Sequence, residues 1–185
     1  MKILVTGGLG FIGSHTVVEL QNAGYEVVVI DDLSNASVEV LDGIEAITGK
    51  KPEFEKLDLR DRNAVSAFKA VGESVHKPLL YYENNLSSLV YLLKELTEKA
   101  SANFIFSSSC TVYGQADELP ITENAPVKPA ESPYGNTKQI GEEIIRDTAK
   151  VYENFNAIAL RYFNPIGAHE SVEIGELPLG VPQNL

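Results

Sequence analysis

Apolar residues along the chain follow two patterns, short unbroken runs and helical spacing, and the two patterns alternate. The short runs predict strands at residues 2–6, 26–30, 103–106 and 157–160, and residues 54–57 predict a weaker strand. The helical spacing predicts helices at residues 11–23, 38–48, 61–68, 78–99 and 134–152. Strands that alternate with helices favour an α/β fold whose parallel sheet is covered on both faces.

The alternation fails at one place, between the helix that ends near Phe68 and the long helix that begins near Pro78. No apolar strand lies between them, although right-handed strand–helix–strand connections require one. In a doubly wound sheet the absent strand is the fourth, which lies beside strand 1 at the switch point where dinucleotides bind. The sequence therefore predicts a doubly wound parallel sheet (Rossmann-like) with one expected central strand missing.

Composition and charge exclude several classes of protein. The 185 residues are 44% hydrophobic and 22% charged, with a formal net charge of −11, so no basic stripe exists to bind nucleic acid. The longest apolar runs are too short to cross a membrane. Cys110 is the single cysteine, and His15, His76 and His169 are too scattered for a zinc cluster, so we expect no metal. A strand begins directly after Met1, which leaves no room for a signal peptide and favours the cytoplasm.

Three glycines, Gly7, Gly10 and Gly13, follow the first strand and open the first helix. Glycine at these positions lets a pyrophosphate approach the helix N-terminal amides, although tight strand–helix packing alone could also require it. Asp31 lies 18 residues after Gly13, close to the spacing of an acid that binds a ribose. The charges of Asp31 and Asp32 would repel a 2′-phosphate, which favours NAD over NADP. The alternative is that Asp31 caps the following loop.

Two weaker signals concern the same cofactor. Asp58 and Leu59 close the third strand, where an adenine could be held, but an aspartate after a strand is often only a turn residue. Asn84 and Asn85 lie in the long helix, where asparagine has poor propensity. Their side chains face either solvent or the cofactor, and the sequence does not separate these alternatives.

Candidate chemistry lies on Ser109, Tyr134 and Lys138. Ser109 ends a strand at the carboxyl edge, where such sheets hold their ligands. Tyr134 and Lys138 are one helical turn apart and point the same way, so the ammonium is expected to lower the pKa of the phenol. A phenolate can take the proton of an alcohol, and a serine hydroxyl can bind the same oxygen while hydride leaves the carbon. Cys110 is interpreted as a small packing residue.

Six segments together resemble the extended short-chain dehydrogenase/reductase family, and within it the nucleotide-sugar epimerases. They are residues 6–15 (TGGLGFIGSH), 69–74 (KAVGES), 77–79 with the downstream asparagine pair, 107–114 (SSSCTVYG), 132–138 (SPYGNTK) and 161–168 (RYFNPIGA). The resemblance covers nearly the whole chain. It implies NAD-dependent inversion at C4 of a UDP-hexose, and a homodimer as the full-length form.

The resemblance also assigns roles to individual residues. Ser109, Tyr134 and Lys138 match the family's catalytic positions. The positions that match NAD-binding ones are Gly7, Gly10, Phe11, Ile12, Gly13, Asp31, Asn35, Asp58, Leu59, Lys69, Asn84, Tyr134, Lys138, Tyr162 and Phe163. The UDP-sugar is expected on Ser109, Tyr134, Asn164 and Asn184. Residues 1–163 would then form the NAD-binding domain, and residues 164–185 the start of a truncated substrate-binding region.

The chain departs from the family at two points. A strand that precedes the KAVGES segment in the family is absent, because Phe68 joins Lys69 directly, and the sequence ends at Leu185, where the family continues. These 185 residues alone are therefore expected not to epimerise a UDP-sugar, and an inactive NAD-binding fragment is one alternative function. A nucleotide-sugar 4,6-dehydratase is another, disfavoured because Cys110 and Thr111 stand where that class needs a carboxylate.

Overall fold

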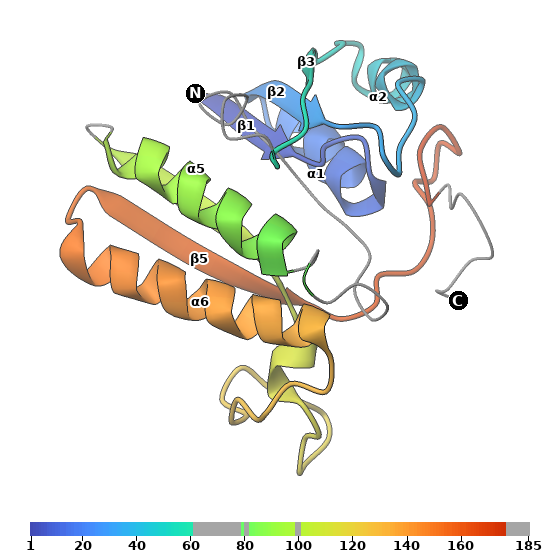
Figure 1. Cartoon of the computed structure of the whole chain (residues 1–185). Helices are drawn as coiled ribbons and strands as arrows, with labels where there is room; N and C mark the ends of the chain where they lie inside the picture. Colours follow the sequence, from blue (N-terminus) through green and yellow to red (C-terminus); the bar gives the residue numbers. More distant parts are fainter. Residues whose placement is uncertain (61–78, 80–81, 99–100, 177–185) are drawn as a thin grey trace. The chain divides into compact units, whose positions relative to one another are not determined.

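The computed structural model describes residues 1–60, 79, 82–98 and 101–176 (Figure 1). The helix expected at 61–68, the junction of Phe68 with Lys69, and Asn184 lie outside these residues, and so does the side chain of Asn84. The chain forms two compact units. Of the described residues, the first unit contains 1–60 and 164–176, and the second contains the remainder up to 163.

The first unit alternates strands and helices as predicted. Its elements are β1 (Lys2–Thr6), α1 (Phe11–Asn22), β2 (Glu26–Asp31), α2 (Val40–Thr48) and β3 (Glu53–Lys56). The strands pair in parallel in the order β1-β2-β3. β1 and β2 were predicted from apolar runs and β3 as a weaker strand, and the observed ends differ from the predicted ones by no more than one residue.

The core of the first unit is apolar and is completed by a segment that follows the second unit in sequence. Val17 and Val18 from α1, Val29 from β2 and Ile44 from α2 are fully buried there, and Ile174 joins them at 4% exposure. The close approach of this later segment depends on a glycine. A Cβ built on Gly43 of α2 would lie 2.5 Å from the carbonyl oxygen of Glu173.

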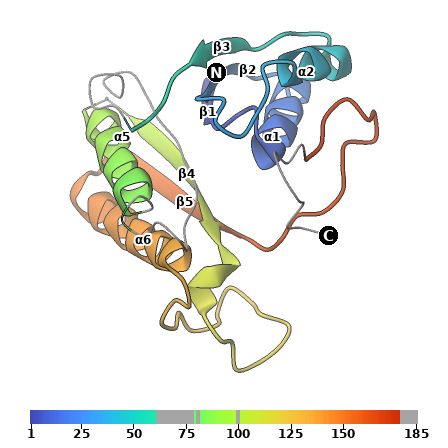
Figure 2. The ribbon, with the colours of Figure 1, turned by 45° about the vertical axis from the view of Figure 1, so that its right-hand side comes forward.

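Over its described residues, the second unit contains two parallel strands and two α-helices. Its elements are the π-helical turn η1 (Glu83–Ser87), α5 (Ser88–Thr97), β4 (Ala102–Ser109), the 3₁₀ turn η2 (Cys110–Tyr113), α6 (Pro133–Val151) and β5 (Phe155–Tyr162). Figure 2 shows α5 and α6 side by side along the β4–β5 sheet. Leu89 and Leu93 of α5 pack there with Ile145 of α6 and Phe155 of β5.

Two features of the second unit differ from the simplest expectation. The long helix predicted at 78–99 contains the π turn at 83–87, a wider turn that often marks a functional position. The described strands also form two hydrogen-bonded sheets, β1-β2-β3 and β4-β5. A doubly wound sheet would join them through its fourth strand, which is the strand that the sequence lacks.

Candidate catalytic and cofactor sites

The glycine turn lies in the first unit, between β1 and α1. The N-cap of α1 is Gly10, which has no side chain to cap the helix, and the first turn contains no acidic residue. The N-terminal amides of α1 are therefore suited to bind an anionic phosphate. Gly13 packs directly on the turn, since a Cβ there would lie 2.1 Å from the carbonyl oxygen of Gly7. The turn fits the pyrophosphate of a dinucleotide.

Asp31 ends β2 and is buried beside this turn. Its Oδ2 accepts a hydrogen bond from the backbone N–H of Leu9 at 3.1 Å, and its Oδ1 accepts one from the N–H of Leu33 at 2.9 Å. Asp31 thus braces both the glycine turn and the loop after β2, which is the loop-capping role that the sequence left open. Each oxygen retains a further lone pair, so ribose binding stays a prediction.

Asp32 is paired, which weakens one argument from the sequence. The guanidinium of Arg60 lies 3.5 Å from Asp32 Oδ2, and its Nε donates to Asp58 Oδ1 at 2.6 Å. The hydrogen bond with Asp58 raises the pKa of Arg60 further. Since Arg60 offsets the charge of Asp32, the repulsion of a 2′-phosphate rests mainly on Asp31. The sequence offered a signal that we missed, a basic residue two positions after Asp58.

The second unit brings Ser109, Tyr134 and Lys138 together. Ser109 is the last residue of β4, and Tyr134 lies in the first turn of α6, where Ser132 accepts a capping hydrogen bond from Gly135 N–H at 3.1 Å. The Tyr134 side chain hydrogen-bonds to Ser109. Lys138 Nζ lies 5.4 Å from the centre of the Tyr134 ring and donates to the carbonyl oxygen of Ser107 at 2.7 Å.

The pKa of Tyr134 differs from the expected direction. Burial raises it above the ordinary value, the hydrogen bond with Ser109 lowers it, and the net pKa shift is upward. Burial also lowers the pKa of Lys138 to about 8. The expected lowering of the Tyr134 pKa by Lys138 is therefore wrong for the protein without ligands. The ammonium binds the Ser107 carbonyl and lies over the rings of Phe106 and Tyr134.

The helix that carries the asparagine pair is tied to α6. Asn85 Nδ2 donates to Thr137 Oγ1 at 2.9 Å, and Asn136 Nδ2 donates to the hydroxyl of Tyr82 at 2.8 Å. Asn85 is therefore partly buried and faces α6 at Thr137.

The remaining predicted residues are spread over both units. Tyr162 ends β5 and is the register partner of Ser109, whereas Phe163 and Asn164 after it are exposed. In the first unit, Leu59 is buried and Asn35 is exposed. Lys69 and Asn184 lie outside the described residues.

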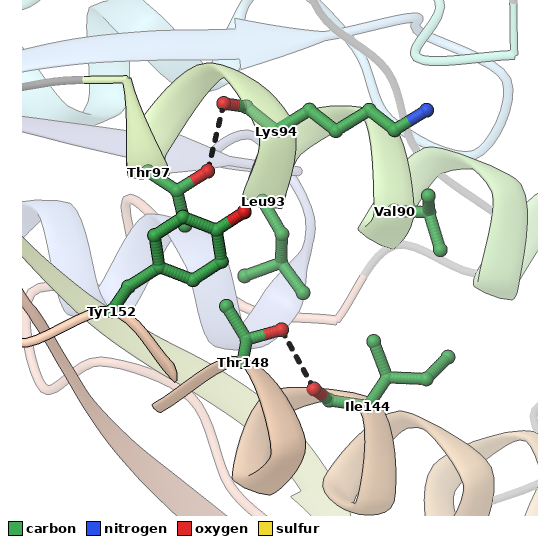
Figure 3. A pocket seen from close by; sticks show the side chains of 7 residues that line it. All are labelled: Val90, Leu93, Lys94, Thr97, Ile144, Thr148 and Tyr152. Atoms are coloured by element: carbon green, nitrogen blue, oxygen red, sulfur yellow. Dashed lines mark hydrogen bonds between the residues drawn. The ribbon is translucent and has the colours of Figure 1, made fainter. Parts of the chain in front are cut away.

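Figure 3 shows a hollow elsewhere in the second unit, between α5 and α6. Its lining is Val90, Leu93, Lys94, Thr97, Ile144, Thr148 and Tyr152. None of these was predicted as a site residue, so the hollow is separate from the chemistry proposed for Ser109 and Tyr134. Within the described ranges, no helix is both long and apolar enough for a bilayer crossing.

Comparison with known proteins gives a consistent result. The chain is 50% identical to the UDP-glucose 4-epimerase of Haemophilus influenzae, over all of this chain and 59% of that protein. That alignment is 200 positions long, although this chain has 185 residues. The excess is consistent with the strand that the sequence analysis found to be absent. The chain spans about three fifths of the length of the curated relatives that it matches.

Solved structures match over the whole chain as well. The UDP-glucose 4-epimerase of Bifidobacterium longum, in complex with NAD⁺ and UDP, is 45% identical with a TM-score of 0.91, and the match covers 60% of that protein. The enzyme of Stenotrophomonas maltophila, with bound NAD and formylated UDP-arabinopyranose, is 41% identical with a TM-score of 0.91 over 59% of its chain. The model of one family, described as "NAD dependent epimerase/dehydratase family", matches residues 3–177. With the glycine turn in one unit and the serine, tyrosine and lysine in the other, this chain belongs to the NAD dependent epimerase/dehydratase family.

Proposed function

We propose that the protein containing these residues interconverts UDP-glucose and UDP-galactose by inversion at C4, through a 4-keto intermediate, with NAD as its bound cofactor. The observation that carries the proposal is the joint placement of Ser109, Tyr134 and Lys138 at the meeting of β4 and α6. The relatives that match over the whole chain are UDP-glucose 4-epimerases, which supports this substrate class.

Tyr134 is the proposed base of the reaction. NAD, when bound, supplies the hydride acceptor and donor. The Tyr134 oxygen takes the proton of the 4-hydroxyl, and the Ser109 hydroxyl binds the same sugar oxygen. Because burial raises the pKa of Tyr134, its phenolate needs a positive charge nearby. Lys138, one turn along α6, is placed to provide that charge.

The glycine turn is proposed to hold the cofactor, because the uncapped α1 terminus and the Gly13 contact fit a pyrophosphate. The other proposed NAD contacts are Asp31, Asn35, Asp58, Leu59, Lys69, Asn84, Tyr162 and Phe163. The proposed UDP-sugar contacts, besides the catalytic hydroxyls, are Asn164 and Asn184. In this proposal residues 1–163 serve the cofactor and residues 164–185 begin the part that serves the nucleotide sugar.

The test is an assay of the whole protein with UDP-galactose, in which UDP-glucose is measured directly. We expect conversion with no net change in absorbance from NADH, since each cycle returns the hydride. A 4-keto-6-deoxy product would instead indicate a dehydratase. No product from a folded, NAD-loaded whole protein would support the inactive alternative.

Cofactor choice is tested on the chain itself by titration with NAD and with NADP. We expect the chain to bind NAD more tightly than NADP, and Asp31→Ala to bind NAD more weakly than the unmodified chain. The reason is that Arg60 pairs with Asp32, whereas Asp31 binds a backbone N–H group and keeps its negative charge near the ribose. Equal affinity of the unmodified chain for NADP would remove the proposed role of Asp31.

We also propose that the whole protein is a cytoplasmic homodimer. The apolar hollow between α5 and α6 supports a contact on that face (Figure 3). Sedimentation equilibrium of the whole protein should give twice the mass of one chain, and a monomer at micromolar concentration would contradict the proposal.

A further inference from the structure

A stripe of three side chains on α6 contacts the serine run that ends β4. Tyr134, Lys138 and Glu142 are spaced by four residues, so they lie on one face of the helix in successive turns. Each contacts a different serine. Tyr134 binds the hydroxyl of Ser109, and Lys138 binds the carbonyl of Ser107. Glu142, the member with no role in the proposed reaction so far, binds Ser108.

The carboxylate of Glu142 is buried and fully engaged. Its side chain is 8% exposed, and its Oε1 accepts from Ser108 Oγ at 2.6 Å and from Arg161 Nε at 2.9 Å. Its Oε2 accepts from Arg161 Nη2 at 2.7 Å. Burial alone would raise the pKa of Glu142, but the hydrogen bonds from Arg161 and Ser108 outweigh it and the pKa falls. Glu142 is therefore held as a carboxylate by a forked, charge-assisted contact.

The two residues that Glu142 joins are neighbours across the sheet. Ser108 of β4 and Arg161 of β5 are register partners in the parallel ladder, and α6 lies against both strands (Figures 1 and 2). One carboxylate thus fixes a helix to two strands, one residue before Ser109 on β4 and one before Tyr162 on β5.

The same network also reaches the residues after Ser109. The guanidinium of Arg161 lies 4.8 Å from the centre of the Tyr113 ring, which is buried at the end of η2. The Ser109 hydroxyl accepts a hydrogen bond from the N–H of Thr111 in that turn. The residues on either side of Ser109 in sequence are therefore both connected to the network. Ser108 binds Glu142 directly, and η2 contacts Arg161 through Tyr113.

We propose that Glu142, through Ser108 and Arg161, is a positioning residue that holds the Ser109 end of β4 against the Tyr134–Lys138 turn of α6. This rests on the proposed function, because positioning is meaningful only for a reaction at Ser109 and Tyr134. Glu142 touches neither reacting atom. Its charge is matched by Arg161, so its effect is on geometry and not on the charge of Lys138, whose pKa shift follows from burial alone.

The test compares Glu142→Gln and Ser108→Ala with a control on the same helix. The control, Asp147→Asn, removes a carboxylate whose ion pair with Lys150 is exposed. In the whole protein we expect Glu142→Gln to lower kcat by about 10- to 100-fold with KM within about twofold, because a small displacement of reacting groups costs that much. Ser108→Ala, which keeps the ion pair and leaves the buried charge balanced, should lower kcat by about fivefold, and Ser108→Thr should restore most of it.

A second readout does not depend on turnover. The phenolate of Tyr134 can be titrated in the 185-residue chain by ultraviolet absorbance, as the difference from Tyr134→Phe. The hydrogen bond from Ser109 lowers the pKa of Tyr134. If Glu142 positions Ser109 for this bond, Glu142→Gln and Ser108→Ala should both move the Tyr134 titration to higher pH, and Asp147→Asn should not. The effects of Glu142→Gln and Ser108→Ala should also be less than additive, because both break one network.

A purely structural role predicts different results, and these would overturn the proposal. Glu142→Gln would then lower the unfolding temperature while kcat per folded molecule and the Tyr134 titration stayed unchanged. Additive effects of the two variants, or no effect of Ser108→Ala on either readout, would also overturn it. If the unmodified whole protein fails to epimerise, the proposed function falls, and the Tyr134 titration alone then decides whether Glu142 positions Ser109.

Discussion

The two units of this protein hold their predicted site residues by different means. In the first, the main chain forms the site: glycines turn the backbone, and Asp31 binds the N–H groups of Leu9 and Leu33. In the second, side chains form it: Tyr134 meets Ser109, and Glu142 meets Ser108. An added Cβ should therefore damage the first unit, whereas loss of a polar group should damage the second.

The difference follows from what each unit is proposed to bind. A pyrophosphate is recognised by amide groups that every residue carries, so the requirement is that no side chain intrudes. Proton transfer needs one atom of suitable pKa at one place, so the requirement is for a particular side chain. The following changes test this contrast, beginning with the largest expected effect.

Tyr134→Phe should abolish turnover in the whole protein, by about 1,000-fold or more, because it removes the proton acceptor and keeps the ring. NAD binding should remain within a few-fold of normal, since the glycine turn belongs to the first unit. Turnover is measured with UDP-galactose, and NAD binding by fluorescence quenching. Near-normal turnover would reject Tyr134 as the base, and the contrast between the units would fail with it.

Gly13→Ala should destabilise the ligand-free chain by about 3 kcal/mol, as for strong overpacking, because the new Cβ would lie 2.1 Å from the backbone oxygen of Gly7. Gly10→Ala is the matched control, since its Cβ would meet the same oxygen at 3.4 Å, an ordinary contact. Urea denaturation of both variants measures the difference. Equal stability of the two would show that packing against the turn is not what requires glycine at position 13.

Lys138 should make stability depend on pH. Its pKa is lowered to about 8 in the folded chain, so between about pH 8 and 10.5 the unfolded chain binds more protons than the folded one. Stability from this residue therefore rises with pH across that window, by about 3 kcal/mol. Lys138→Met should remove the rise and Lys150→Met, at an exposed pair, should not. Urea denaturation at pH 7 and pH 10 gives the comparison, and a rise that survives in Lys138→Met belongs to another group.

Val172→Gly should stabilise the chain slightly, by about 0.5 kcal/mol, because the relief of backbone strain is partly offset by the chain entropy of glycine. Val172 is 89% exposed and has a φ of 64°, a left-handed conformation that costs a β-branched residue on the order of 1 kcal/mol. Val127→Gly, at an exposed valine that is not among the positive-φ residues, should be neutral or destabilising. Thermal unfolding distinguishes the two, and a destabilised Val172→Gly would mean that its side chain makes an unrecognised contact.

Sequence reasoning predicted β2 to within one residue because burial on both faces leaves an unbroken apolar run, as in Val27–Ile30. It also placed β4 and β5, but these strands extend up to three residues beyond the predicted ends. It predicted the Ser109–Tyr134–Lys138 cluster because helical spacing and strand ends place those side chains. It failed for the pKa of Tyr134 and the charge of Asp32, because burial and the reach of Arg60 depend on tertiary packing.

The Glu142 network contains one feature that the sequence predicts and one that it does not. Its spacing from Lys138 was readable in the sequence, since four residues make one helical turn. Its partner Arg161 was not, because that contact depends on the register of β4 with β5. The π turn at 83–87 contains Asn84 and Asn85, whose poor helix propensity was noted in the sequence, but that propensity does not specify a π turn.

The burial of Ile174 has a consequence for the order in which the protein is made. All of the second unit lies between Ile44 and Ile174 in sequence, and the second unit is continuous. A ribosome therefore releases every residue of the second unit before it releases the side chain that fills the core of the first. Since continuous units fold as they emerge, we expect the second unit to fold during synthesis, while the first waits with an incomplete core although its strands are made earliest.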